Sequence, residues 1–421
     1  MENDNKEFNT RSFVFGLIAG LFVMLFLSIG GLILYNALVV KKLKAAIDTQ
    51  INDIAAQSDK SREGIFNEDL MNKLGDIEKY FNKYSIYDMD DEEIRRGVIE
   101  GYLYGTGDKY AEYYDPDEID ELNSDLQGKF YGIGATLISG DDGWPTITSV
   151  YDDAPAGKAG LKGGDRIVEI DGENSYKKSL DEVVSKIRGP IGTNVTLKIA
   201  REGEDDYLEF TITRAEVIKK TVDYRMENDR IGYIQITSFE DATVDQFTDA
   251  LATLKGSDMK ALVIDLRSNT GGLLSAVVDI ADQLLPKSLI LYTENVAGVK
   301  ETFESDEEHK LQIPIVVLTN GYTASAAEIL TGTLRDNNAA ISMGTTTYGK
   351  GVVQGFKYFK DGSAMKLTIE EYFLPSGFAL DGVGIEPDIE VKFDSEAYYD
   401  EENPFDNQFD EAVKYLENKL N

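Results

Sequence analysis

A serine that could act as a nucleophile stands in the C-terminal half of the chain. Ser325 lies in the stretch Asn-Gly-Tyr-Thr-Ala-Ser-Ala-Ala-Glu at 320–328, where a buried strand gives way to a helix. In the first turn of that helix the serine would lie near free backbone N–H groups, as suits an acyl-transfer nucleophile. The position also suits an ordinary N-cap, supplied by Thr323 or Ser325. The stretch alone therefore leaves a catalytic and a structural interpretation open.

The hydroxyl of a nucleophilic serine needs a base, and the sequence offers a lysine rather than a histidine. The single histidine, His309, stands in Glu-Glu-His-Lys at 307–310, which is typical of a solvated surface loop. Lys350 lies between Gly349 and Gly351. A lysine can act as a base where desolvation lowers its pKa to near neutral. A solvated lysine in a glycine-rich surface turn is the alternative.

A polar residue that could orient this lysine follows it. Gln354 lies four positions after Lys350, and this spacing places both on one face of a strand or a helix. The Gln354 amide could then hold the lysine nitrogen in place, as the third member of a catalytic triad does.

A third stretch could stabilise negative charge. Residues 265–272, Asp-Leu-Arg-Ser-Asn-Thr-Gly-Gly, close a strand and open a helix. Paired glycines let backbone amides approach a ligand closely, and a helix N-terminus favours negative charge. Gly271 and Gly272 therefore suit an oxyanion hole. An ordinary strand-to-helix turn is the alternative.

Alternating strands and helices position these stretches. Apolar runs predict strands at 261–266, 313–318 and 340–343, and helices at 273–284 and 324–334. This alternation implies crossover connections and a parallel sheet. Ligands of such sheets bind at the carboxyl ends of the strands, in the loops that follow.

Three other segments have their own texture. Residues 45–126 read as helical, including a helix that Asp91-Glu92-Glu93 could cap and that runs to Leu103. A β-rich segment follows, with strands expected at 135–138, 146–150, 166–170, 195–200 and 208–213 and a helix at 180–187. Near the C-terminus, one helix face carries Phe409, Val413, Leu416 and Leu420, and should dock on the protein's own core or on a partner.

Composition excludes several kinds of function. The 421-residue chain has a net charge of −34, which argues against a nucleic-acid partner because phosphate binding needs clustered Lys and Arg. There is no cysteine, so disulfides, thiol nucleophiles and Cys-based zinc sites are excluded. We expect no metal and no cofactor.

An apolar segment near the N-terminus predicts a membrane anchor at residues 12–40. From Phe13 to Val40 there is no charged residue, and about 20 apolar residues span a bilayer. Signal peptides have shorter apolar cores and a small-x-small cleavage site, which is missing near Val40. An uncleaved anchor is therefore favoured, although Lys41, Lys42 and Lys44 alone would put the body inside the cell.

Together the three chemical stretches resemble the carboxyl-terminal processing, or tail-specific, proteases. The resemblance rests on Asp265–Gly272, on Ala324-Ser325-Ala326 with Glu328, and on Gly349-Lys350-Gly351 with Gln354, and it extends from about 68 to 391. It implies a serine peptidase of the Ser–Lys type. Ser325 would be the nucleophile, Lys350 the general base and Gln354 the residue that orients it. Ala326 and one glycine of Gly271 and Gly272 would form the oxyanion hole.

The β-rich segment resembles a PDZ domain. The loop Tyr131-Gly132-Ile133-Gly134 is similar to the loop that captures a terminal carboxylate, and the strand from Ala135 would add the substrate tail as an extra strand. This implies polypeptide substrates with apolar free C-termini. Arg188, before Gly189 and Pro190, could contact the protease body.

The resemblance implies a multidomain α+β protein at the cell membrane, single-pass, with its catalytic body outside the cytoplasm. Its parts would be a cytoplasmic stub and anchor, a helical region, a PDZ-like domain, a crotonase-like α/β protease core with βαβ units, and a C-terminal helix (1–44, 45–126, 127–216, 217–394 and 395–421). The helical flanks are similar to regions that dimerise in relatives, so a homodimer could form. A catalytically silent PDZ scaffold and a Ser–Lys esterase are the rival functions.

Overall fold

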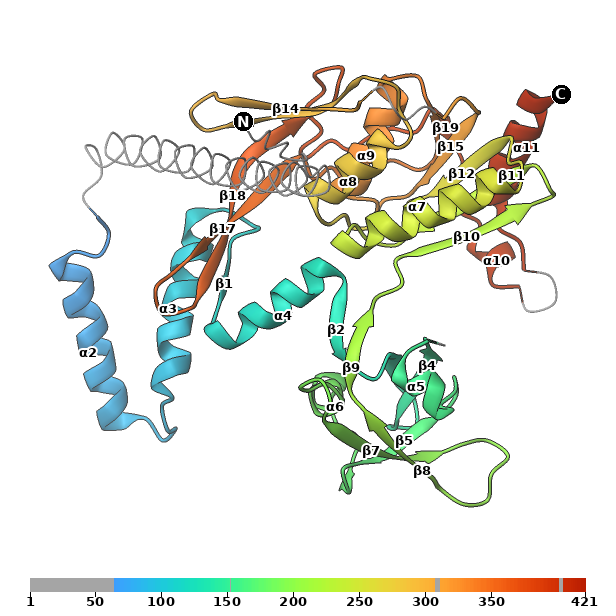
Figure 1. Cartoon of the computed structure of the whole chain (residues 1–421). Coiled ribbons are helices and arrows are strands. Elements are labelled where there is room, and N and C mark those ends of the chain that lie inside the picture. The colour runs from blue at the N-terminus through green and yellow to red at the C-terminus, as the bar shows by residue number, and fades with distance from the viewer. Residues whose placement is uncertain (1–63, 152, 307–310, 401–403) are drawn as a thin grey trace, which may run out of the picture. The chain divides into compact units, whose positions relative to one another are not determined.

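The structure is a computed structural model that describes residues 64–151, 153–306, 311–400 and 404–421 (Figure 1). The chain divides into two units, residues 1–90 and 91–421. The anchor expected at 12–40 and His309 lie outside the described residues. Within the described ranges, no helix combines the length and the apolar character needed to cross a bilayer.

The first unit contains one described helix, α2 (Glu68–Tyr84). The Asn67 side chain caps it by accepting a hydrogen bond from the Leu70 amide at 3.0 Å. Phe81 and Tyr84 are among its exposed apolar side chains. This helix agrees with the prediction of helical structure for the early part of the chain.

The second unit begins with helices, but a strand interrupts them. Helices α3 (Asp91–Thr106) and α4 (Pro116–Gln127) flank strand β1 (Glu112–Tyr114). The predicted helical region 45–126, in which a turn was expected at 113–116, therefore also contains a strand, β1. The aromatic residues Tyr113 and Tyr114 favour extended backbone there, and β1 pairs with a strand more than two hundred positions later.

A β-rich domain follows, and its alternating sequence agrees well with its strands. The Ser179 side chain caps the domain's main helix, α6, by accepting from the Glu182 amide at 3.2 Å. One sheet has the order β3-β4-β5-β7-β8, with β6 beside β5, and a separate pair joins β2 to β9. The elements of this domain are β2 (Lys129–Gly132), β3 (Ala135–Ser139), β4 (Pro145–Val150), α5 (Pro155–Ala159), β5 (Arg166–Ile170), β6 (Glu173–Asn174), α6 (Leu180–Ile187), β7 (Asn194–Ala200), β8 (Leu208–Thr213) and β9 (Ala215–Ile218).

The remainder of the chain forms an α/β core around a six-stranded sheet. The order is β10-β11-β12-β15-β16-β19, and every neighbouring pair is parallel except β10 with β11. The βαβ units predicted from the alternation are confirmed. The elements are β10 (Val222–Glu227), β11 (Ile231–Ile236), α7 (Asp241–Gly256), β12 (Ala261–Asp265), α8 (Leu274–Asp282), β15 (Ile315–Thr319), α9 (Ala326–Asp336), β16 (Ile341–Gly344) and β19 (Ile389–Glu390).

Both faces of this sheet are buried, because successive side chains of a strand point to opposite faces. On one face, Ile234, Leu262 and Val317 pack in a large apolar cluster with side chains of α7, α8 and α9. On the other face, Ala261 and Val316 pack with the C-terminal helix α11 (Asn407–Leu420). Continuous apolar strands such as β12 and β15 are therefore buried along their whole length.

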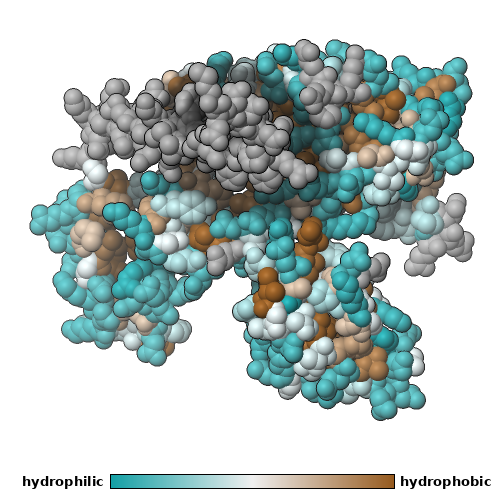
Figure 2. All heavy atoms as spheres, in the orientation of Figure 1, coloured by the Kyte–Doolittle hydropathy of each residue, from teal (hydrophilic) through white to brown (hydrophobic). Residues whose placement is uncertain are grey.

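Helix α11 docks on the core of the same chain, which is the first of the two alternatives predicted for it. Ala412 and Leu416 are completely buried, and Phe409 packs edge-on against Tyr233 with ring centroids 5.3 Å apart. The short helix α10 (Ser395–Tyr398) precedes α11. Hydrophilic residues cover most of the described surface on the face that Figure 2 shows, as the acidic composition leads us to expect.

A second, antiparallel sheet completes the core. Its order is β1-β18-β13-β14, and β17 also pairs with β18. Its remaining strands are β13 (Leu289–Asn295), β14 (Lys300–Glu304), β17 (Val352–Tyr358) and β18 (Ala364–Phe373). Because β17 begins just after Lys350 and β18 reaches back to β1, this sheet brings the N-terminal part of the second unit to the lysine.

Candidate active site

Ser325 stands at a sharp turn between strand β15 and helix α9. Its backbone has φ 55° and ψ −120°, a conformation that costs energy for a residue with a side chain. A strained serine between a strand and a helix is also how α/β hydrolases expose a nucleophile. The side chain is half-buried, whereas its neighbours Ala324 and Ala326 are buried. The strain therefore presents the hydroxyl at the rim of an otherwise packed turn.

Lys350 belongs to a glycine turn that packs against a later segment of the chain. A Cβ on Gly349 would lie 2.7 Å from the Gly384 amide nitrogen, and one on Gly351 would lie 2.5 Å from that of Asp381. The glycines thus allow close packing, in addition to leaving the lysine side chain free. The Tyr348 amide donates to the Thr323 carbonyl oxygen at 2.9 Å, which joins the lysine turn to the serine turn.

A buried carboxylate connects the two turns more directly. Glu328 is fully buried, and its Oε2 accepts from the amides of Ser325 (2.8 Å) and Lys350 (2.9 Å). Its Oε1 accepts from the Thr347 hydroxyl at 2.5 Å and from the Gly349 amide at 2.7 Å. Burial raises the pKa of Glu328, and these four donors oppose that rise. One carboxylate thereby fixes the backbone N–H groups of the serine and the lysine.

A buried hydroxyl holds the carbonyl groups of the same two residues. Tyr372, on β18, is 1% exposed. Its hydroxyl lies 3.2 Å from the carbonyl oxygen of Ser325 and also within hydrogen-bond distance of that of Lys350. Burial raises the pKa of Tyr372 well above its ordinary value, so the hydroxyl keeps its proton and remains a donor. Glu328 and Tyr372 together fix the backbones of Ser325 and Lys350 through their N–H and C=O groups.

The loop 265–272 lies directly against the serine turn. A Cβ on Gly271 would stand 2.7 Å from Ser325 Cβ and 3.0 Å from the Ala326 nitrogen. The Ala324 amide donates to the Asn269 carbonyl oxygen at 2.9 Å. The structure thus brings together the serine stretch and the glycine loop that the sequence singled out.

The two glycines of this loop differ in what their amides do. The Gly271 amide donates to Asn269 Oδ1 at 2.8 Å, so it is already engaged. Gly272 is exposed, and in the described part of the chain its amide makes no hydrogen bond. The Ala326 amide is in the first turn of α9, where helix N–H groups have no intrahelical acceptor. The amides of Gly272 and Ala326 are therefore free to bind an oxyanion.

The reactive side chains themselves are not joined. Across the described ranges, no hydrogen bond links Lys350 Nζ to the Ser325 hydroxyl or to the Gln354 amide. Instead, Gln354 Nε2 donates to Thr368 Oγ1 at 3.5 Å, and Lys350 Nζ lies 4.5 Å from the centroid of the Tyr110 ring. The predicted hydrogen bond between Gln354 and Lys350 is not formed in this structure, where the Gln354 amide donates instead to Thr368, the residue opposite it on β18.

Burial and nearby positive charges shift the pKa of Lys350 downward. Burial lowers the pKa of its ammonium group, and the nearby positive charges of Lys366 and Lys109 lower it further. Lys366 itself is held by Glu112 at 2.5 Å and by the Tyr114 hydroxyl at 2.9 Å. The direction of this pKa shift is the one a general base needs.

The loop predicted to bind a peptide carboxylate has the tight backbone that such a loop requires. Gly134 has φ 79°, and a Cβ there would stand 2.2 Å from Ala154 Cβ. The carbonyl oxygens of Ile133 and Gly134 accept from the amides of Ala156 and Tyr151. Gly132, Ile133 and Gly134 are buried, Ala135 is half-buried, and Tyr131 is exposed.

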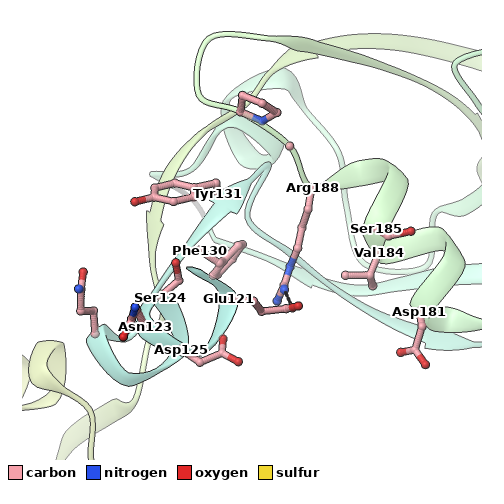
Figure 3. A pocket seen from close by; sticks show the side chains of 13 residues that line it. Glu121, Asn123, Ser124, Asp125, Phe130, Tyr131, Asp181, Val184, Ser185 and Arg188 are labelled. Carbon is pink, nitrogen blue, oxygen red and sulfur yellow. Dashed lines mark hydrogen bonds and ion pairs between the residues drawn. The ribbon is translucent and has the colours of Figure 1, made fainter. Parts of the chain in front are cut away.

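A cleft of about 910 Å³ lies between helices α4 and α6 (Figure 3). Of the five residues predicted to bind peptide, Tyr131 lines it. Figure 3 also shows Arg188, at the end of α6, pointing toward Glu121 of α4, with which it forms an ion pair. Arg188 was predicted to contact the protease body, but its ion pair is with Glu121 of α4, in the preceding helical region.

Sequence reasoning missed Tyr110 and Tyr372 and gave Glu328 no role. A signal existed for Glu328, because Ser-x-x-Glu before an apolar run is typical of a helix start. No local signal existed for Tyr110, which reaches the site because β1 pairs with the distant strand β18, and Tyr372 reaches it from β18, the neighbour of β17. In the described ranges, no group of three or more acidic or histidine side chains is arranged to hold a metal ion.

The fold and the site define a class, the serine-type hydrolases built on a parallel α/β core with an inserted β-rich domain. Sequence models agree: that of Peptidase family S41 matches residues 230–391, and that of the PDZ domain matches 146–201. The chain is 35% identical to carboxy-terminal processing protease CtpB of Bacillus subtilis over 341 residues, which are 80% of this chain and 70% of the relative. It is also 35% identical to a carboxy-terminal-processing protease of Bartonella bacilliformis (76% and 74% covered).

A solved structure supports the same assignment of the fold. The chain is similar in fold to a protein from Bacteroides fragilis that is provisionally named an S41 protease. Its crystal structure superposes with a TM-score of 0.51 and 20% identity, over 76% of this chain and 90% of that one. The protein belongs to peptidase family S41 and is a serine-type peptidase of the carboxy-terminal processing group.

Proposed function

We propose that the protein is an endopeptidase that processes proteins from or near their C-termini, with Ser325 as nucleophile and Lys350 as general base. The observation that carries this proposal is the strained turn of Ser325, whose backbone is tied to that of Lys350 by Glu328 and Tyr372. Such strain is maintained only where surrounding contacts enforce it, as they do here.

The chemistry follows from the roles of these groups. Neutral Lys350 takes the proton from the Ser325 hydroxyl as Oγ attacks the scissile carbonyl carbon. The amides of Ala326 and Gly272 stabilise the oxyanion. The carbon–nitrogen bond then breaks, and the lysine gives its proton to the leaving amine. Water hydrolyses the acyl-enzyme by the same steps. For this reaction the Lys350 side chain must turn toward Ser325, and Gln354 would orient it there.

The substrate class is inferred from the β-rich domain. The loop 132–134 and strand β3 would take the free C-terminus of a polypeptide by adding it as a strand. The tight turn at Gly134 supports this role. Apolar terminal residues are expected, because PDZ-type loops bind the carboxylate on backbone amides and leave the last side chain to an apolar pocket.

We also propose that residues 12–40 anchor the protein in the cell membrane with the catalytic body outside the cytoplasm. The support is the uncharged run from Phe13 to Val40. Extraction of membranes with alkaline carbonate measures anchoring, and protease added to intact cells measures sidedness. Release of the full chain by carbonate would contradict the anchor, and protection of the body in intact cells would contradict the topology.

The proposed reaction is tested with the full chain in detergent and an unstructured protein that ends in apolar residues. Wild type should cleave it, and Ser325→Ala and Lys350→Ala should each lose roughly a thousandfold or more in kcat/KM. Peptide binding, measured by fluorescence anisotropy, should survive in both variants. Binding without cleavage by wild type would favour a silent scaffold. Turnover of esters alone would favour an esterase.

A further inference from the structure

The turn that precedes strand β1 reaches into the active site. Tyr110 is half-buried in this turn, and its ring centroid lies 4.5 Å from Lys350 Nζ. Its hydroxyl oxygen is buried, and its interaction with the Lys109 ammonium group raises the pKa of Lys109. The Tyr110 ring is therefore the contact that the structure assigns to the Lys350 ammonium group.

The same turn also engages the side chain proposed to orient the lysine. Asp108 accepts from the Tyr110 amide at 3.0 Å, from the Thr368 amide at 2.7 Å and from the Thr368 hydroxyl at 3.0 Å. That hydroxyl oxygen accepts from Gln354 Nε2. One short turn thus contacts Lys350 through Tyr110 and engages Gln354 through Asp108 and Thr368.

The physical character of the Tyr110 contact opposes catalysis. The face of an aromatic ring carries negative charge density and attracts an ammonium ion, but it has no such attraction for a neutral amine. A lysine acting as general base must be neutral. The ring therefore stabilises the protonation state that cannot take the serine proton, in a position where Nζ makes no hydrogen bond to Ser325.

The other charged and titratable groups around Lys350 act in different directions. Lys366 on β18 and Lys109 next to Tyr110 disfavour the ammonium form. The Lys109 ammonium also lies 4.9 Å from the centroid of the Tyr110 ring. Three other titratable groups contact the backbone of the Lys350 turn and not the lysine side chain. They are Glu328 of α9, Tyr372 of β18 and Asp381, which accepts from the Gly351 amide at 2.9 Å.

We propose that Tyr110 is a positioning residue that holds the Lys350 ammonium apart from Ser325 in the resting enzyme. This inference rests on the proposed function of Ser325 and Lys350. Displacement of the turn 107–111 would release Lys350 from Tyr110 and remove Asp108 from Thr368, the residue to which Gln354 donates. The turn would thereby control both the place and the protonation state of the base.

The test compares pH profiles of kcat/KM for the full chain in detergent. Tyr110→Leu keeps an apolar side chain but removes the aromatic face, so its rising limb should lie at lower pH than that of wild type. At the acidic foot of the profile its kcat/KM should be roughly threefold to tenfold higher. Tyr110→Phe retains the ring and should follow wild type. Tyr104→Leu, at an exposed tyrosine of α3, controls for unspecific effects of losing an aromatic ring.

A second measurement does not depend on activity. Trace acetylation of Lys350, read by mass spectrometry across pH, reports the fraction of neutral amine. Tyr110→Leu should move this titration to lower pH, and Tyr110→Phe should not. An unmoved titration would overturn the proposal even if activity fell. If instead the titration moves while Ser325→Ala cleaves as well as wild type, the contact is supported and the proposed catalytic role of Ser325 fails.

Discussion

At the scale of single residues, the site depends on Glu328 and Tyr372, two side chains to which we assign no part in the reaction itself. Glu328 and Tyr372 fix the peptide groups of Ser325 and Lys350 from opposite sides, by their N–H and C=O groups. A nucleophile and its base must be held to within a fraction of an ångström. Because both clamps act on backbone, the lysine side chain remains free to move while its attachment point does not.

This view predicts the result of Glu328→Gln. The four donors that surround Glu328 now bind two carboxylate oxygens, and a glutamine amide would offer them only one oxygen. Two buried N–H or O–H groups would then face an NH₂ group. An unsatisfied buried donor costs about 1–3 kcal/mol. We expect kcat/KM to fall by roughly tenfold to a hundredfold as the Ser325 and Lys350 turns separate.

Kinetics and denaturant unfolding should be measured together for this variant. Glu301→Gln, at an exposed position of β14, is the matched control and should behave as wild type. Full activity in Glu328→Gln would contradict the clamp.

At the scale of elements, the site is made by two strand-to-helix turns that pack against each other. The loop after β12 and the turn after β15 are neighbours because their strands are parallel and adjacent. At their contact, Gly271 leaves no room for a side chain. The close approach places the glycine loop beside the nucleophile without any interaction between side chains.

The contact predicts that Gly271→Ala inactivates the protein. The residue has φ 104°, and the added methyl group would stand 2.7 Å from Ser325 Cβ and 2.9 Å from the Ala324 carbonyl oxygen. Loss of oxyanion binding should lower kcat by about a hundredfold or more in single-turnover assays. Gly203→Ala is the matched control, because Gly203 has φ 86° and nothing within 4 Å of the added carbon. The control should lose about 1 kcal/mol of stability and no activity.

The sequence predicts those features of the fold and the site that depend on neighbouring residues, and it misses those that depend on the pairing of distant strands. Periodicity and capping gave β5, α6 and β8 their observed ends, because those signals lie within the elements themselves. The three chemical stretches were recognised from glycine and alanine patterns. The contact of Tyr110 with Lys350 was not, since it depends on β1 pairing with β18. The hydrogen bond expected between Lys350 and Gln354 is not formed in this structure, because the two side chains contact Tyr110 and Thr368 instead.

At the scale of the whole molecule, a partly buried group of ion pairs joins the C-terminal helix to the core. Arg267, just after β12, binds Asp265 at 2.6 Å and Asp406 at 2.7 Å, and Gln408 at 3.0 Å. Asp406 also caps α11 by accepting from the Phe409 amide at 3.0 Å. The loop that carries Gly271 therefore begins at a residue that the C-terminus holds in place.

This group predicts a pH-dependent loss of stability in Asp406→Asn. Burial raises the pKa of Asp406, but the hydrogen bonds from Arg267, the charge of Arg267 and the amides of Phe409 and Gln408 together outweigh burial and lower the pKa overall. A carboxyl with a lowered folded-state pKa stabilises the protein above its unfolded-state pKa, and this contribution is lost as pH falls through the folded-state value. Asp406→Asn should therefore be about 1–3 kcal/mol less stable at pH 7, and the difference should close below about pH 4.

Urea unfolding at several pH values measures this difference. Asp394→Asn is the matched control, since Asp394 is exposed and caps α10 by accepting from the Ala397 amide, and no ion pair joins it to an arginine in the described ranges. A difference for Asp406→Asn that stayed constant with pH would contradict the ionic contribution.

The pairing of β1 with β18 also has a consequence for the order in which the protein matures. The Thr368 amide bonds to Asp108 across 260 positions, and Lys366 bonds to Glu112 across 254. Contacts between residues so distant in sequence form late, because closing a long loop costs entropy before the contact repays it. A chain is synthesised from its N-terminus, so β1 and the turn that carries Tyr110 have no strand to pair with until β18 has been made. A nascent or truncated chain would carry Ser325 without a finished active site, and proteolysis would begin only when the molecule is nearly complete.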